Sequence, residues 1–101
     1  MIWLNARDID PAGVEIAMSG LYSVWLWAPD DARATITING NDFAVSPSES
    51  PKHAYTWRKA DTANLKAGAV QLSLSENVAA IAMSISETFD PSVAMRDMSV
   101  F

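Results

Sequence analysis

Residues 33–46 read RATITINGNDFAVS, and this stretch decides the fold class. Polar and apolar residues alternate strictly before the turn, which places Ile36 and Ile38 on one face of a strand. Asn39-Gly40 is a strong signal for a two-residue hairpin turn. Beyond it, Val45 returns to the apolar face. We therefore predict a β-hairpin over residues 33–46.

The same period of two recurs along the chain. Apolar residues alternate with polar or small ones over residues 70–75 and 81–86, with a turn at Ser75-Glu76-Asn77 between them. Residues 21–28 are apolar on both faces except for Ser23, which is typical of a central strand covered on both sides. Further strands are expected at residues 3–5, 14–18 and 53–59, and in the tail that follows the loop Phe89-Asp90-Pro91-Ser92 up to Phe101. The pattern predicts an all-β fold, an antiparallel β-sandwich or jelly roll of about eight short strands.

Length and charge narrow the function classes. A chain of 101 residues fits one domain, which we place over residues 1–101. The net charge of -5 disfavours nucleic acid and an anionic membrane surface as partners, since both attract basic proteins. There are no cysteines and no apolar run long enough to span a membrane. The N-terminus does not read as a signal peptide. The protein is then either intracellular or a domain of a longer secreted chain, and we favour the second.

Catalytic and metal-binding signals are weak. His53 is the one histidine, with no second histidine, cysteine or acid at ligand spacing, so we expect no metal site. No nucleophile-elbow motif or glycine-rich phosphate loop is present in the sequence. Asp8-Ile9-Asp10 and Asp30-Asp31 could form calcium corners, but we interpret them as turn residues. We expect a protein that is not an enzyme and needs no cofactor.

Aromatic residues are the most informative feature of the composition. Four tryptophans exceed what a core of this size requires. Trp25 and Trp27 share one face of a strand, and residues two apart on a strand lie about 6.6–6.8 Å from each other. Trp57 shares a face with Tyr55 and His53 by the same periodicity. Rigid, large rings of this kind form binding surfaces when exposed and pack the core when buried, and the sequence leaves both possibilities open.

The segment from Lys52 to Lys59 combines aromatic and basic residues. It holds three of the seven basic residues and no acid. One interpretation is an edge strand whose charged side chains prevent it from pairing with a strand of another molecule. The other is a ligand-binding strip, in which rings stack on a ligand and cations meet its hydroxyls or carboxylates. The candidate ligand-binding residues are Trp57, Tyr55, Trp27, His53, Arg58 and Lys59.

Several motifs together resemble carbohydrate-binding modules with a galactose-binding-like jelly roll, especially families six and thirty-five. The stretch Ser19–Ala28, SGLYSVWLWA, is similar to their strand sG-Y-x-V-W-V-R-A, with Trp27 in place of the arginine. Ile36–Asn41 resembles their hairpin, and Trp57 with Leu65-Lys66-Ala67-Gly68 resembles their W…L-x-A-G turn. The other similar segments are the opening strand Ile2–Ile9, the closing strand Ile81–Ile85 and the exit Phe89-Asp90-Pro91.

The resemblance implies a non-catalytic module that binds a polysaccharide or oligosaccharide through surface aromatics. It also implies a parent glycoside hydrolase or polysaccharide lyase in the same chain, and an extracellular or periplasmic location. The glutamates that open the family's first strand, which often help to hold calcium, are Asn5 and Arg7 here. We therefore expect no calcium there. The alternative is a structural or protein-interaction β-sandwich that does not bind sugar.

Overall fold

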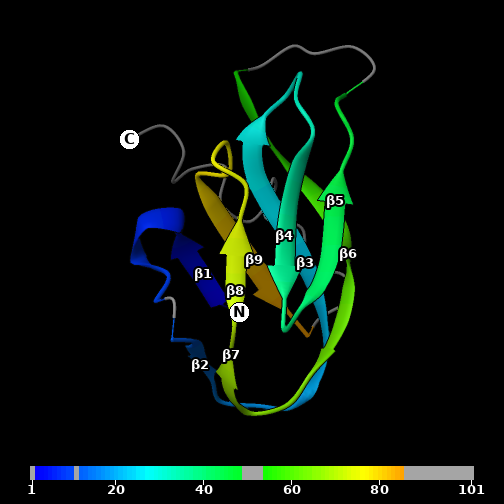
Figure 1. The fold of residues 1–101 in the computed structure, drawn as a ribbon. Helices are drawn as coiled ribbons and strands as arrows, with labels where there is room; N and C mark the ends of the chain where they lie inside the picture. Colours follow the sequence, from blue (N-terminus) through cyan, green and yellow to red (C-terminus); the bar gives the residue numbers. More distant parts are fainter. Residues whose placement is uncertain (1, 11, 49–53, 86–101) are drawn as a thin grey trace.

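The computed structural model describes residues 2–10, 12–48 and 54–85, and within these it is an antiparallel β-sandwich (Figure 1). This confirms the predicted fold class. The elements are β1 (Ile2–Asn5), the 3-10 turn η1 (Ala6–Asp8), β2 (Val14–Ile16), β3 (Gly20–Pro29), β4 (Ala34–Ile38), β5 (Asn41–Val45), β6 (Tyr55–Leu65), β7 (Gly68–Val70), β8 (Leu72–Leu74) and β9 (Ala80–Ser84). The predicted tail strand and the loop at 89–92 lie outside the described residues.

Two main sheets enclose one apolar core. The larger has the strand order β1-β9-β3-β6 and the smaller the order β5-β4-β8, while β2 and β7 form a two-stranded sheet at one end (Figure 1). The core is made of side chains from both main sheets. Leu26 from β3, Ile36 from β4 and Ile81 from β9 are each 0% exposed. Burial of such side chains is the main force that holds the two layers together.

The hairpin over residues 33–46 is confirmed as β4 and β5. Ile36 pairs with Phe43, and Ile38 with Asn41, across the turn. Asn39 and Gly40 have φ angles of 49° and 85°, both in the left-handed region that a type I′ turn requires. The Asn-Gly pair therefore sets the register, which puts the apolar residues of β4 into the core.

The predicted strand at 70–75 is divided between two sheets. Val70 ends β7, which pairs with β2, whereas Leu72 begins β8, which pairs with β4. At the break, the backbone N–H of Gln71 donates to Oδ1 of Asn39 at 2.9 Å. The turn at 75–77 then leads from the smaller main sheet into β9 of the larger one.

The strand predicted at 53–59 is longer than its sequence pattern suggested. β6 extends through Leu65, and a bulge shifts its pairing with β3: Trp25 pairs with Lys59, but Val24 pairs with Asp61. The extra residue resets the alternation. Ala63 and Leu65 are consequently buried, although a continuous period of two from Trp57 would have turned them outward.

Candidate binding surface

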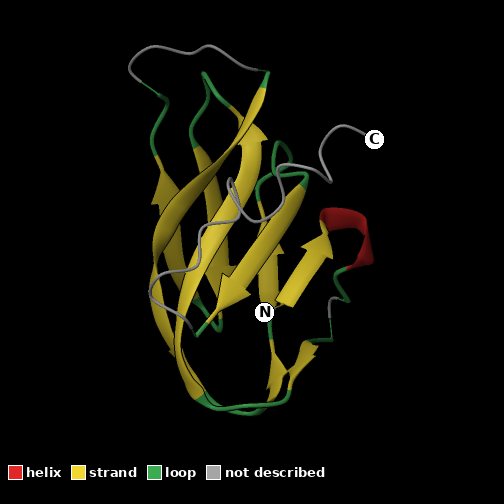
Figure 2. Cartoon of the chain, turned by 180° about the vertical axis from the view of Figure 1, so that it is seen from behind, coloured by secondary structure: helices red, strands yellow, loops and turns green. Residues whose placement is uncertain are grey.

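One face of the larger main sheet points away from the core, and we call it the outer face. Figure 2 views the molecule from this side. The strand registers place all four tryptophans on it, in two adjacent rows. One row runs Trp3, Ala82, Trp25 and Lys59, and the next runs Asn5, Ala80, Trp27 and Trp57. The outer face is therefore rich in aromatic side chains.

Trp27, Tyr55 and Trp57 form a contiguous group, which we call the ring cluster. Trp27 and Trp57 are cross-strand partners with ring centroids 5.4 Å apart and planes inclined by 43°. Trp27 also stacks with Tyr55 at 5.9 Å and 27°. Tyr55 is 40% exposed, and the two indoles are half-buried. The three rings therefore hold one another in position, and the cluster remains accessible to solvent at Tyr55.

The ring contacts do not join Trp25 to Trp27, although these two residues share one face of β3. Trp27 shares its nearest ring contacts with the two aromatics of β6, and Trp25 in the neighbouring row has none among the described residues. Ring pairs of this kind are worth about 0.5–1.5 kcal/mol beyond the apolar area they bury. The cluster consequently offers a preorganised apolar contact with the rings already fixed in position.

Trp25 itself is half-buried, and its Nε1 donor is inaccessible to solvent and has no hydrogen-bond partner among the described residues. A buried donor without an acceptor costs about 1–3 kcal/mol. Because this atom is shielded, we assign Nε1 of Trp25 no hydrogen bond to a ligand. The expectation that residues 21–28 are covered on both sides holds only in part, since Ser23 is 4% exposed but Leu21 is 52% exposed.

Arg58 lies apart from the ring cluster, since it alternates with Trp57 and Lys59 along β6. Its guanidinium donates to the backbone carbonyls of Pro29 at 2.6 Å, Ala32 at 3.0 Å and Ser46. These bonds tie the loop after β3 and the end of β5 to β6. Both terminal nitrogens of the guanidinium, Nη1 and Nη2, donate to the protein itself, whereas the buried Nε has no hydrogen-bond partner among the described residues. We therefore assign Arg58 a structural role.

Lys59 does lie on the outer face, one row from Trp57 and beside Trp25. It lines a shallow depression of about 470 Å³ together with Leu21, Ser23, Thr62 and Ile85, which we call the lysine hollow. The candidate residues Trp27, Tyr55, Trp57 and Lys59 are thus brought together on one face. His53, the remaining candidate, lies outside the described residues.

The acidic pairs behave as turn residues in the described part of the chain. Oδ1 of Asp10 accepts the backbone N–H of Ala12 at 2.9 Å. Oδ1 of Asp30, which is 4% exposed, accepts the hydroxyls of Ser48 and Thr56. No group of three or more potential metal ligands occurs among residues 2–10, 12–48 and 54–85. Within these same ranges, no helix has the length and apolar content to cross a membrane.

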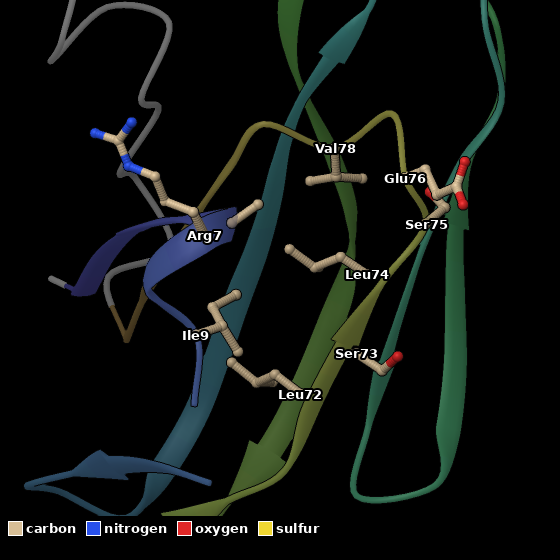
Figure 3. Close-up of a pocket in the computed structure, with 9 residues that line it drawn as sticks. Arg7, Ile9, Leu72, Ser73, Leu74, Ser75, Glu76 and Val78 are labelled. Atoms are coloured by element: carbon tan, nitrogen blue, oxygen red, sulfur yellow. The ribbon is translucent and has the colours of Figure 1, made fainter. Parts of the chain in front are cut away.

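A second hollow opens between η1 and β8, at the edge where the two main sheets do not meet (Figure 3). Ile9, Leu72, Leu74 and Val78 point into it, whereas the charged end of Arg7 points away. Ligand pockets combine an apolar wall with a few polar groups that converge on the ligand. This hollow lacks such convergence among its labelled residues, so the outer face is the stronger candidate.

The sequence could not reveal that Trp3 shares the outer face with Trp25, because β9 is inserted between their strands. Only the pairing of three segments far apart in the chain brings these residues into one row. Comparisons with models of protein families, with curated proteins and with solved structures find no match to this chain. The interpretation of the outer face therefore depends on its own geometry.

Proposed function

We propose that this protein is a non-catalytic carbohydrate-binding module that holds a polysaccharide or oligosaccharide against the ring cluster. The observation that carries the proposal is the contiguous contact of Trp27, Tyr55 and Trp57 on a sheet face, with Tyr55 open to solvent. Sugar rings present apolar C–H faces, and rigid aromatic side chains bury such faces with little loss of conformational entropy.

The resemblance of the motifs around Trp25 and Trp57 to carbohydrate-binding modules supports the same function. In this proposal the domain belongs to a longer extracellular or periplasmic protein with a glycoside hydrolase or polysaccharide lyase in the same chain. The module raises the local concentration of that enzyme on its substrate through effective concentration, with no catalytic group of its own.

Binding to a panel of soluble polysaccharides tests the proposal, by affinity electrophoresis and then by calorimetry on any glycan that binds. We expect the wild-type domain to bind at least one glycan and Trp57→Ala to lose that binding while remaining folded. Trp3→Ala is the matched control, because Trp3 is on the same face but separated from the ring cluster by β9. Failure of the wild type to bind neutral and acidic glycans, or undiminished binding by Trp57→Ala, would refute the proposal.

A second candidate is a structural sandwich whose outer face packs against a neighbouring domain of the same longer protein. The observation that favours it is the apolar character of this face beyond the ring cluster, where Trp3 is 41% exposed and Ile85 is 40% exposed. Contiguous exposed apolar surface commonly marks an interaction site. Under this alternative Trp3→Ala and Trp57→Ala weaken the contact between domains alike, whereas glycan binding depends on Trp57 and not on Trp3.

A further inference from the structure

By strand register, Lys59 is the only charged residue on the outer face among the described parts of β1, β3, β6 and β9. The nearby Asp61 is exposed, but it pairs with Val24, whose side chain faces the core. The other residues that the registers assign to this face are uncharged, and Lys59 lies among them in the row of Trp3 and Trp25. The protein as a whole carries a net charge of -5. A single cation on the one aromatic face of an acidic protein is therefore a distinctive local feature.

The bulge in β6 builds the lysine hollow around this cation. Lys59 and Thr62 are three residues apart, yet both line the hollow, because the extra residue between them resets the alternation. Thr62, which is exposed, pairs with the buried Ser23 on β3, and both residues line the hollow together with Lys59. Within the described chain, Lys59 makes no ion pair or hydrogen bond with another side chain.

The hollow is close enough to the ring cluster for one ligand to reach both. Lys59 follows Trp57 by two residues on the same strand, a separation of about 6.6–6.8 Å along β6. A sugar residue packed against Trp57 therefore places its neighbour, or its own substituent, over the hollow. The ammonium of Lys59 and the hydroxyl of Thr62, both from exposed residues, can then donate hydrogen bonds to the same oxyanion.

We propose that the lysine hollow is a subsite for an anionic group of the bound glycan, a carboxylate or a sulfate. This inference rests on the proposed function and adds the charge class of its ligand. The net negative charge of the protein does not oppose it strongly, because exposed charges more than about 8 Å away are screened at physiological salt. The contact with Lys59 lies well inside that distance.

The test compares oligosaccharides that share one backbone and are neutral, carboxylated or sulfated, using calorimetry on the wild-type domain, Lys59→Gln and Lys66→Gln. Lys66 is the matched control, since it is exposed in the turn after β6 and lies outside the hollow. We expect one or both anionic forms to bind the wild type and Lys66→Gln about fivefold to tenfold more tightly than the neutral form. The carboxylated and sulfated arms identify which oxyanion the hollow prefers.

In Lys59→Gln the preference for anionic ligands should disappear while binding of the neutral form is kept. The preference should also shrink as salt is raised. Equal affinity of the wild type for all three forms, or a preference that survives in Lys59→Gln, would overturn the subsite while leaving the ring cluster as a glycan site. Absence of binding to any form would overturn the proposed function as well, so the two failures are distinguishable.

Discussion

Trp27 and Trp57 face each other across β3 and β6 as direct register partners, with ring centroids 5.4 Å apart. This pair joins a central strand to an edge strand on the outer face of the sheet. Cross-strand aromatic pairs stabilise a sheet and also hold each ring in a fixed orientation. The same contact therefore contributes to folding and to the preorganisation of the ring cluster.

A double-mutant cycle measures this contact. Trp27→Ala and Trp57→Ala should show a coupling free energy of about 0.5–1.5 kcal/mol in urea unfolding, because the two rings touch. The pair Trp3→Ala and Trp57→Ala should be additive, since β9 and β3 separate these residues. Additivity of the first pair would show that the indoles do not interact in solution.

Arg58 should matter for stability and leave the preference for glycans unchanged. Lysine at this position cannot reproduce the planar fork that reaches the carbonyls of Pro29, Ala32 and Ser46. We expect Arg58→Lys to lower the free energy of unfolding by about 1–3 kcal/mol. Arg33→Lys, at an exposed position, should stay within about 0.5 kcal/mol of the wild type. Equal stability of the two variants in chemical denaturation would contradict the structural role of Arg58.

Asp30 should be a stabilising residue despite its charge. It is 4% exposed, and its Oδ1 accepts the hydroxyls of Ser48 and Thr56, which links the end of β3 to β6 and to the loop after β5. Asp30→Ala should cost about 1–3 kcal/mol because two half-buried hydroxyls lose their acceptor. Asp31→Ala is the control, since Asp31 is exposed. Thermal unfolding of both variants distinguishes a structural Asp30 from a solvated one.

The hairpin turn gives a prediction about backbone conformation alone. Gly40 has a φ of 85°, and a Cβ built there would meet no atom within 4 Å. Gly40→Ala should therefore cost about 1 kcal/mol through the unfavourable backbone angle, with no steric clash. Urea unfolding with an unchanged m-value checks this. A variant as stable as the wild type would mean that the turn adopts another conformation.

Local patterns predicted the strands well because their causes are local. The alternation around Ile36 with Asn39-Gly40 after it predicted β4, β5 and their register. The alternation over residues 81–86 predicted a strand, and β9 (Ala80–Ser84) confirms it as far as Ser84. In these segments, side-chain alternation and turn chemistry act over a few residues and can be read directly.

The candidate site was predicted only in part because it depends on pairing between distant segments. Periodicity put Tyr55 and Trp57 on one face, but only the pairing of β3 with β6 brings Trp27 against them. The role of Arg58 depends on carbonyls from two other segments. The bulge after Lys59 has no marker such as glycine, so the residues lining the hollow could not be anticipated.

The most direct test of the central claim is the response of the four indole N–H resonances in two-dimensional NMR during titration with a bound glycan. Each resonance can be assigned by a single Trp→Phe substitution. The ring cluster predicts large shifts for Trp27 and Trp57, with Trp3 unaffected. Shifts confined to Trp3, or no shift of any indole while the glycan binds, would show that the ligand is held elsewhere on the protein.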